Sequence, residues 1–484
     1  FHDVVPGSSI NMVYRDSDRI YKDIFSSTDK MRRQALASIY GSPDQATDLG
    51  VLNTTGWMRS DIVAIPVELY SRLAPTVCLD NIQVRASDGA VLVPMANVPG
   101  FGMRSVSAPA QATDDCPVTV MQSDSSDYVL ENRLVRVAIN GNGQIVSYYD
   151  KAEHRELVPK GAAGNVLELY DDVPLFWDAW DIEIYHLEKS RILEGAAVSI
   201  VDQGPHVASL SVRVPISDDS ELTQTISLSS LSSRLDFACD VDWHENRKCL
   251  KAAFTWDIHS DMATYETQFG VVQRPTHRNT SWDMAKFEVC AHKFADLSEY
   301  GYGVALLNDS KYGHSTLDNT MSLSLLRAPK GPDEECDMGR HSFRYAVYPH
   351  AGTFAESNVV QEAYQFNVPL VQLPTGGHGA VRLADLERPF FSVSGARNVV
   401  LDTVKRAEDD ENSYIVRLYE AYGGHARALL TTRLPARDVV KVNILENPVP
   451  DEDTSAPSVQ WLAHSKSLQI QVKPFEIVTL KFSV

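Results

Sequence analysis

The chain contains the stretch Leu235-Asp236-Phe237-Ala238-Cys239-Asp240-Val241-Asp242-Trp243, in which large apolar residues occupy every second position. Successive side chains of a β-strand point to opposite faces, so these apolar side chains share one face. The same alternation precedes the stretch at residues 208–214, and it resumes at residues 250–256 after the polar turn His244–Arg247. Alternation on one side only predicts an antiparallel β-sandwich with one face of each sheet in solvent.

This β pattern extends through most of the chain. The turn sequence Asn140-Gly141-Asn142-Gly143 lies between two short apolar runs, as expected of a β-hairpin. Changes in composition predict a small β domain at 46–127, a large β-sandwich domain at 128–385 and a C-terminal β-sandwich domain at 386–484. Residues 351–395, which contain several Pro and Gly residues, are expected to connect the two sandwiches. The chain is therefore expected to be mainly β.

Residues 8–40 differ from the rest, because their apolar residues recur at spacings of three and four. This spacing predicts one amphipathic helix, with Ser8 or Ser9 as its N-cap, a candidate kink at Ser26–Thr28 and an end at Gly41. A single amphipathic helix cannot bury its own apolar face. We therefore expect residues 1–45 to be the end of a helix bundle whose other helices precede this chain.

The composition is that of an ordinary globular protein. Apolar residues make up 44% of the 484 residues, charged residues make up 22%, and the net charge is −20. Such an acidic balance argues against binding to nucleic acid or to an anionic membrane, which requires basic faces. No apolar stretch is long enough to predict a transmembrane helix.

The cysteines and the absent motifs exclude several classes. The 6 cysteines are scattered without a CxxC pair, which argues against a disulfide scaffold or a zinc ribbon and suits an intracellular compartment. The sequence has no GxSxG nucleophile elbow, no P-loop and no dinucleotide-binding GxGxxG motif after a strand.

The densest group of candidate binding residues is the stretch 167–181, which holds four Asp, two Trp, one Tyr and one Phe. Aromatic faces stack on sugar C–H surfaces and carboxylates accept hydrogen bonds from hydroxyls, so this mixture is typical of carbohydrate sites. Paired carboxylates are also used by glycosidases. The alternative is a loop whose Trp side chains fill the sandwich core while its Asp side chains cap turns.

A second candidate is His2-Asp3, which precedes the predicted helix. Neutral imidazole is a common metal ligand, and a neighbouring carboxylate can orient it or bind substrate, although such a pair is more often structural. Two further loops, 268–283 and 333–343, mix Asp, His, Arg and Gly. Their Arg–Asp pairs are expected to tie the loops to a sheet, and neither His277 nor His341 has a second ligand at a familiar metal-binding spacing.

Taken together, these motifs strongly resemble the C-terminal half of the glycoside hydrolase family 38 α-mannosidases, in particular their cytosolic and vacuolar branch. The matching segments run along nearly the whole chain: Phe1–Ser9, Asn53 with Trp57–Arg59, Asp171–Pro174, Trp177–Asp181, Arg274–His277, Asn279–Asp283, Asn308–Asp309, Lys311–Gly313, Tyr345 with Pro349–His350, and Leu418–Gly424.

The resemblance implies an N-terminal α/β catalytic domain that is missing from this chain, then a helix bundle, then β-sandwiches. His2 matches the family's metal-binding His, which implies Zn²⁺ as cofactor, with Co²⁺ as the alternative. Asp3 matches a sugar-contacting residue. The nucleophile and the general acid belong to the missing domain, so no catalytic residue is assigned here. Further substrate-binding candidates are Asp172, Trp177, Asp178, Asp181 and Arg340.

The implied function is that of the C-terminal portion of a retaining, metal-dependent exo-α-mannosidase acting on mannose-containing oligosaccharides. The implied partners are the N-terminal catalytic portion of the same enzyme and further copies in a homotetramer, and the implied location is the cytoplasm or the vacuole. The alternative is a non-catalytic β-sandwich module for carbohydrate binding or oligomerisation. The two hypotheses differ in whether an upstream catalytic domain with its Asp nucleophile belongs to the same assembly.

Overall fold

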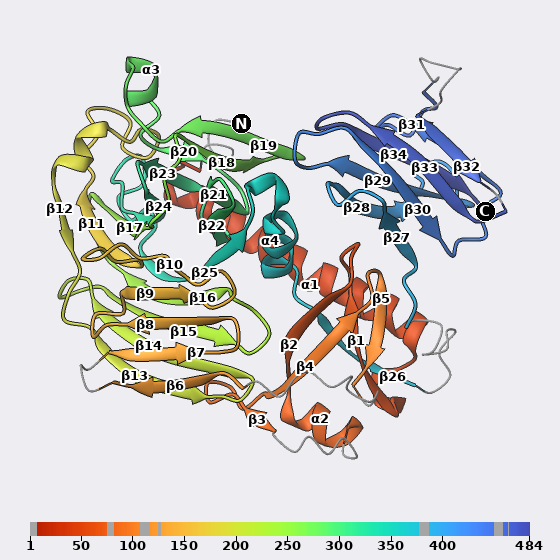
Figure 1. Ribbon diagram of the computed structural model, residues 1–484, viewed down its shortest axis with the longest axis horizontal. Helices are drawn as coiled ribbons and strands as arrows, with labels where there is room; N and C mark the ends of the chain where they lie inside the picture. The colour runs from red at the N-terminus through yellow and green to blue at the C-terminus, as the bar shows by residue number, and fades with distance from the viewer. Residues whose placement is uncertain are drawn as a thin grey trace.

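The computed structural model describes residues 7–74, 82–106, 117–123, 127–376, 387–449, 458–462 and 464–484. Strands dominate these residues, and they form a small β region, a large β-sandwich and a C-terminal sandwich joined by a few helices (Figure 1). This confirms the mainly β fold class. Among the described residues, no helix has both the length and the apolarity that crossing a membrane requires.

The long helix α1 spans Asn11–Tyr40. It ends at Gly41, whose N–H bonds to Ala37 O, as predicted. The expected serine cap is wrong, because the N-cap is Ile10 and makes no side-chain cap bond. The helix continues through Ser26–Thr28, where Thr28 Oγ1 donates to Ile24 O at 2.8 Å, a bond that often bends helices. The candidate kink stays a prediction.

The small β region consists of two three-stranded sheets, with the strand orders β26-β1-β5 and β2-β4-β3. Its elements are η1 (Pro43–Gln45), β1 (Asp48–Asn53), β2 (Arg59–Ile65), α2 (Val67–Leu73), β3 (Gln83–Val84), β4 (Val91–Val98), β5 (Gly102–Ser105) and β26 (Val371–Thr375). Strand β26 returns to this region from the stretch that sequence assigned to the connector. The C-terminal end of α1 packs here, because Tyr40 shares a small core with Met103 and Leu373.

The large sandwich has one nine-stranded sheet, β13-β14-β15-β16-β25-β22-β21-β18-β19. Its strands are β13 (Ala197–Gln203), β14 (Val207–Pro215), β15 (Glu221–Ser229), β16 (Leu235–Trp243), β18 (Met262–Thr267), β19 (Gly270–Pro275), β21 (Phe294–Glu299), β22 (Tyr302–Asn308) and β25 (Gly339–Ala351). The strands pair antiparallel; β15, β16 and β25, for example, lie side by side.

Two shorter sheets pack against this one through a single buried cluster. The five-stranded sheet contains β6 (Thr119–Gln122), β7 (Tyr128–Glu131), β8 (Val135–Ile139), β9 (Ile145–Asp150) and β10 (Arg155–Glu156). The six-stranded sheet contains β11 (Val166–Asp171), β12 (Ser190–Ile192), β17 (Lys248–Thr255), β20 (Val289–Cys290), β23 (Gly313–Leu317) and β24 (Thr320–Arg327). The hairpin predicted around Asn140–Gly143 is confirmed by β8 and β9. The short helices of this region are η2 (Ile184–Glu188), α3 (Ser281–Met284), η3 (Phe354–Glu356) and α4 (Val359–Asn367).

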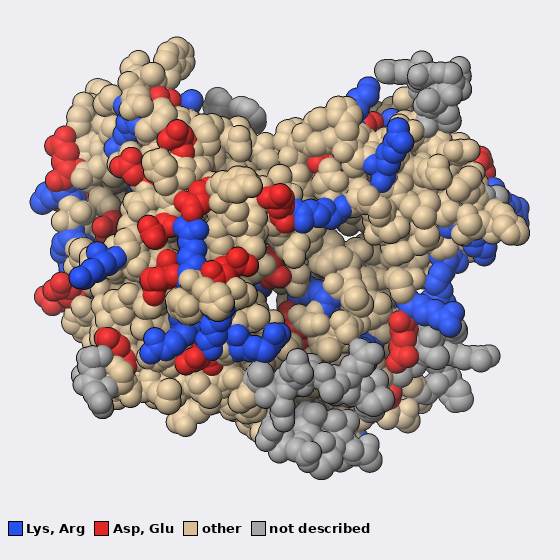
Figure 2. All heavy atoms as spheres, viewed as in Figure 1, with Lys and Arg blue, Asp and Glu red and all other residues tan. Residues whose placement is uncertain are grey.

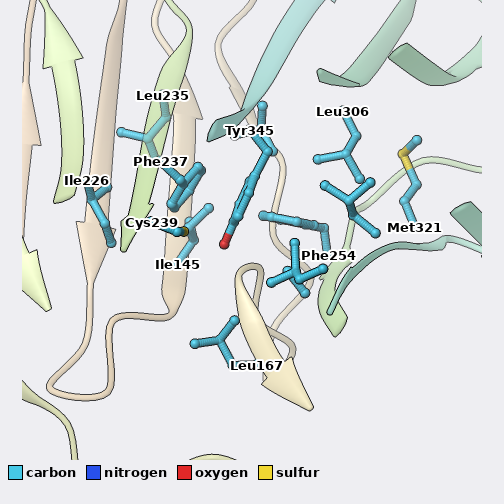
Figure 3. Packing of buried hydrophobic residues seen from close by; sticks show 14 of the residues in the cluster. Ile145, Leu167, Ile226, Leu235, Phe237, Cys239, Phe254, Leu306, Met321 and Tyr345 are labelled. Atoms are coloured by element: carbon cyan, nitrogen blue, oxygen red, sulfur yellow. The ribbon is translucent and has the colours of Figure 1, made fainter. Parts of the chain in front are cut away.

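The core lies between these sheets (Figure 3). Phe237 of β16 stacks on Tyr345 of β25 with ring centroids 4.9 Å apart, and Phe254 of β17 meets Tyr345 edge-on from the facing sheet. The alternation that begins at Leu235 therefore does place its apolar residues in a sandwich core. Strand β17 departs from the prediction of one wet face, because Lys251 on its outer face is also buried and bonds to Glu288 at 2.6 Å.

The C-terminal sandwich consists of two four-stranded sheets, β27-β30-β33-β32 and β28-β29-β34-β31. Its strands are β27 (Phe391–Ser394), β28 (Val399–Arg406), β29 (Ser413–Glu420), β30 (Ala426–Thr432), β31 (Asp438–Val442), β32 (Val459–Leu462), β33 (Ser467–Val472) and β34 (Ile477–Ser483). It has its own buried cluster, as expected of a separate small sandwich.

Candidate functional site

The predicted site residues fall into three groups. His2 and Asp3 lie outside the described residues. Asp172, Trp177, Asp178 and Asp181 belong to one loop, residues 172–183, between β11 and η2. Arg340 lies on β25, at the far end of a second loop, residues 328–338.

Asp172 anchors the first loop where it leaves β11. Its side chain is 2% exposed, and its Oδ2 accepts a bond from Arg327 Nε at 2.7 Å. Its backbone N–H donates to Arg247 O at 2.9 Å. The other oxygen, Oδ1, is buried and has no hydrogen-bond partner among the described residues. Asp172 is thus buried at the base of the loop, and its contact with sugar stays a prediction.

Arg327, the last residue of β24, closes the loop. Besides binding the Asp172 carboxylate, it donates from its Nη2 to the backbone oxygens of Asp178 at 3.2 Å and Asp181 at 2.7 Å. One guanidinium therefore joins the beginning of the loop to a point nine residues later. Arginine suits this position, because its planar head presents several donors in fixed directions.

Asp178 and Asp181 have different environments. The carboxylate of Asp178 pairs with Arg247 at 3.2 Å and accepts a bond from the backbone N–H of Lys330 at 3.2 Å. Asp181 is exposed, and its backbone N–H donates to Trp177 O at 2.9 Å. Asp181 therefore presents a solvated carboxylate, whereas Asp178 ties the loop to residues 328–338.

The two tryptophans lie on the outer side of loop 172–183, the tryptophan loop. Trp177 is 71% exposed and Trp180 is 55% exposed, and their rings lie 6.0 Å apart with an interplanar angle of 34°. The alternative in which these side chains fill the sandwich core is therefore wrong. Trp177 has a positive φ of 57°, and its carbonyl accepts the N–H groups of both Trp180 and Asp181. This turn directs both indoles outward.

The residues behind the loop form an ionic and polar layer. Lys189 and Lys248 both bond to Asp171 and lower the pKa of its carboxyl. Burial lowers the pKa of His186, so its ring is held neutral, edge-on to Tyr170 at 5.3 Å. On the visible face of the large sandwich, Lys and Arg side chains are interspersed with Asp and Glu side chains (Figure 2).

The start of α1 docks on loop 328–338, a few residues after His2-Asp3. Tyr14 OH donates to Gly7 O at 3.0 Å and lies 3.9 Å from Cys336 Sγ, and Asn11 Nδ2 donates to Asp333 at 3.3 Å. Because Lys330 of the same loop binds Asp178, loop 328–338 connects the segment after His2-Asp3 with the tryptophan loop. The described start of the chain, from Gly7 to Tyr14, and Asp178 therefore contact the same loop.

Arg340 is exposed, and its register partner is Asp242 of β16. Its side chain makes no hydrogen bond or ion pair within the described part of the chain, so its role in binding stays a prediction. Across the described residues, no group of three or more His, Cys, Asp and Glu side chains could hold a metal ion. The sequence candidate 268–283 makes structural contacts: Thr280 and Asp283 form a capping box on α3, and His277 lies 3.7 Å from Asp283.

A cavity of about 700 Å³ lies elsewhere, between α1, the small β region and the large sandwich. Its most buried cation, Arg234, is already paired with Asp236 at 2.6 Å and Glu362 at 3.3 Å. The buried Arg234 in this cavity is therefore already neutralised by carboxylates of the chain itself. None of the predicted site residues that the structure describes lines this cavity.

Sequence reasoning missed the residues that organise the loop, namely Arg327, Arg247 and Lys330. The available signal was the segment Arg327-Ala328-Pro329-Lys330-Gly331-Pro332, in which basic residues at a strand end lead into a Pro- and Gly-rich turn. Basic residues at such a position are natural partners for an acidic loop, but the sequence does not show that the two segments are neighbours.

Comparisons with known proteins agree with this arrangement. Residues 130–335 match the family model described as "Glycosyl hydrolases family 38 C-terminal domain", and residues 398–480 match "Glycosyl hydrolases family 38 C-terminal beta sandwich domain". The two matches together span more than half of the chain. They cover the large sandwich from β7 to loop 328–338, with the tryptophan loop, and most of the C-terminal sandwich.

The chain is 37% identical to alpha-mannosidase 2C1 of Homo sapiens, over 99% of this chain and 44% of the relative. It is 33% identical to an alpha-mannosidase of Saccharomyces cerevisiae, over 99% of this chain and 42% of the relative. It thus spans less than half the length of these relatives. The structure of an alpha-mannosidase from Enterococcus faecalis V583 superposes with a TM-score of 0.73, over 98% of this chain and 61% of that one; at 16% identity this shows a shared fold.

Proposed function

We propose that this chain, which belongs to glycosyl hydrolase family 38, forms the C-terminal portion of an α-mannosidase that removes terminal α-linked mannose from oligosaccharides. The observation that carries the proposal is the 37% identity to alpha-mannosidase 2C1 along 99% of the chain. The tryptophan loop beside the start of α1 supports it, because exposed indoles and a solvated carboxylate are suited to binding sugars.

In this proposal the chain binds and orients substrate, and the reacting carboxylates belong to an upstream catalytic portion. Retaining glycosidases use two carboxyl groups, one as nucleophile and one as acid. The proposed sugar contacts on this chain are Asp3, Asp172, Trp177, Asp178, Asp181 and Arg340. Loop 328–338 holds the segment after Asp3 next to the tryptophan loop, which supports a shared substrate site.

We further propose that His2 is one ligand of a metal ion, Zn²⁺ or alternatively Co²⁺, whose remaining ligands come from the upstream portion. This assignment rests on the sequence resemblance. When bound, such an ion would orient the hydroxyls of the terminal sugar and withdraw charge from them.

Helix α1 supports the presence of an upstream partner. It leaves a row of large apolar side chains exposed along its length: Met12, Ile20, Tyr21, Ile24, Phe25 and Met31. Exposed apolar residues in such a row are usually covered by another element. We propose that helices of the upstream portion cover them, and that the complete enzyme forms a homotetramer in the cytoplasm or vacuole. Light scattering of the complete enzyme would measure the oligomeric state.

The test uses the protein together with its upstream portion. We expect it to release mannose from the non-reducing end of an α-linked oligosaccharide, and NMR to show that the product first forms as the α-anomer. We expect one divalent ion per chain by elemental analysis, and loss of both the ion and the activity in His2→Ala. His425→Ala, which removes an exposed histidine of the C-terminal sandwich, is the matched control.

Protein that binds the oligosaccharide without hydrolysing it would contradict the proposal and would favour a non-catalytic carbohydrate-binding module. A metal content unchanged by His2→Ala would contradict the ligand assignment alone.

A further inference from the structure

The tryptophan loop exposes more aromatic surface than packing of the chain requires. Besides Trp177 and Trp180, the neighbouring Leu175 and Phe176 are each about two-thirds exposed or more. A cluster of large apolar side chains on the surface often marks a binding site, whereas single exposed apolar residues are common and need no such explanation. The two indoles lie beside one another in solvent, and together they form a surface on which a flat, amphipathic ligand can bind.

The pair is held by polar contacts rather than by packing. Arg327 bonds to Asp172, Asp178 and Asp181, and the carbonyl of Trp177 accepts two N–H groups of the turn. The loop therefore keeps its shape while its apolar side chains remain in solvent. A site prepared in this way binds with less loss of conformational entropy.

The surroundings of the indoles favour a carbohydrate. The exposed carboxylate of Asp181 follows Trp180 directly. The carboxylate of Asp178, between the two tryptophans in sequence, is mostly buried and already paired with Arg247. A sugar ring has an apolar C–H face and hydroxyls around its edge, which match an aromatic surface with acceptors beside it. A protein partner would instead leave these carboxylates to be desolvated at a cost.

The position of the pair indicates which sugar it would bind. Loop 328–338 lies between the start of α1 and the tryptophan loop, since it bonds to Asn11 through Asp333 and to Asp178 through Lys330. Under the proposed function, the terminal mannose is bound near His2-Asp3, on the α1 side of that loop. The indoles are then placed to meet the next sugar of the chain.

We propose that Trp177 and Trp180 form a binding surface for the sugar that follows the terminal mannose, and that Arg327 is the residue that positions them. This inference rests on the proposed function and gives it a substrate preference: oligosaccharides over small mannosides. Lysine could not replace Arg327, because a single ammonium has no planar fork to reach the Asp172 carboxylate and two backbone oxygens at once.

The experiment compares two substrates of the protein with its upstream portion. One is a linear α-linked manno-oligosaccharide; the other is α-mannosyl fluoride, whose leaving group is too small to reach the indoles. For Trp177→Ala we expect kcat/KM for the oligosaccharide to fall by about fivefold to tenfold, chiefly through KM, as for the loss of one aromatic contact. Hydrolysis of the fluoride should change by less than about twofold.

Three further variants sharpen the result. Trp177→Phe, which keeps an aromatic face, should restore most of the oligosaccharide activity. Arg327→Lys should show the same substrate-dependent loss as Trp177→Ala. Arg213→Lys alters an exposed arginine of β14 that pairs with Glu221, and Tyr300→Ala removes a 99% exposed ring outside the loop; both should leave the two activities unchanged.

Equal losses on both substrates in Trp177→Ala would overturn the inference and would indicate that the indoles pack against the upstream portion. Unchanged activity on the oligosaccharide would overturn it as well. Wild-type protein that hydrolyses neither substrate would overturn the proposed function instead. In that case, calorimetric binding of the oligosaccharide by wild type but not by Trp177→Ala would still support the binding surface.

Discussion

The core around Phe254 and the loop around Trp177 are both rich in aromatic residues, but the rings of the core are buried and those of the loop are exposed to solvent. In the core, aromatic residues alternate with smaller ones, so a strand places each ring between two sheets. In the loop, Phe176 and Trp177 are adjacent and follow Pro174, so no strand can bury both on one face. Apolar area stabilises the first region, whereas charged and backbone hydrogen bonds hold the second.

The largest effect should come from the core. Phe254 is fully buried and contacts both Phe237 and Trp256. Phe254→Ala should lower the free energy of unfolding by about 3–5 kcal/mol, because it removes a ring and leaves a cavity between the sheets. Urea denaturation of the large sandwich would measure this change, with Tyr300→Ala as the control. A loss as small as that of the control would mean that the core repacks around the gap.

The core should also be sensitive to acid. Burial, assisted by the charge of Arg274, lowers the pKa of His314 to about 3, from about 6.5 in the unfolded chain. Between these values the unfolded state binds the proton and the folded state does not, so stability is present at high pH and is lost as the pH falls below about 6.5. We expect this histidine to contribute a loss of about 2 kcal/mol between pH 7.5 and pH 5.

The contribution of His314 is obtained from the difference in pH slope between wild type and His314→Gln. Glutamine does not titrate, so the slope of unfolding free energy against pH should flatten over this interval. His425→Gln, which changes an exposed histidine, is the matched control. Equal slopes for wild type and His314→Gln would contradict this, because they would mean that His314 takes up its proton equally in the folded and unfolded states.

The same contrast explains what could be predicted from the sequence. Period-two alternation identified β14, β16 and β17, because burial of one face imposes it directly. Helix α4 and strand β26 were not found, since residues 351–395 were assigned to a connector on the basis of Pro and Gly content. Strand β26 is short, and only its pairing with the distant β1 makes it a strand.

The residues of the candidate site also differ in whether the sequence could predict them. The acidic and aromatic residues of 172–181 could be recognised as a group because they are close in sequence. Arg327 could not, since its connection to the loop depends on β24 reaching β11 through β17 in the six-stranded sheet. Whether the indoles face the core or the solvent was also open, because it depends on the backbone at Trp177, where φ is positive.

A smaller effect is expected where the loop is anchored. Asp172→Asn keeps the shape of the side chain but removes the charge that Arg327 binds at 2.7 Å. We expect the free energy of unfolding to fall by about 1–3 kcal/mol, the range for a weakened charge-assisted bond to a buried group. Urea denaturation would measure it, and Asp219→Asn, at an exposed turn, is the control. A loss as large as that for Phe254→Ala would show that the loop and the core unfold as one unit.

The smallest effect on stability should come from the most exposed ring. Trp177→Ala should change the free energy of unfolding of this chain by no more than about 0.5 kcal/mol, because the indole buries little area and alanine keeps the backbone bonds that its carbonyl accepts. The same urea series would detect a larger change. A loss above about 1.5 kcal/mol would mean that the indole is buried against the chain itself. Packing, and not only polar bonds, would then stabilise the loop.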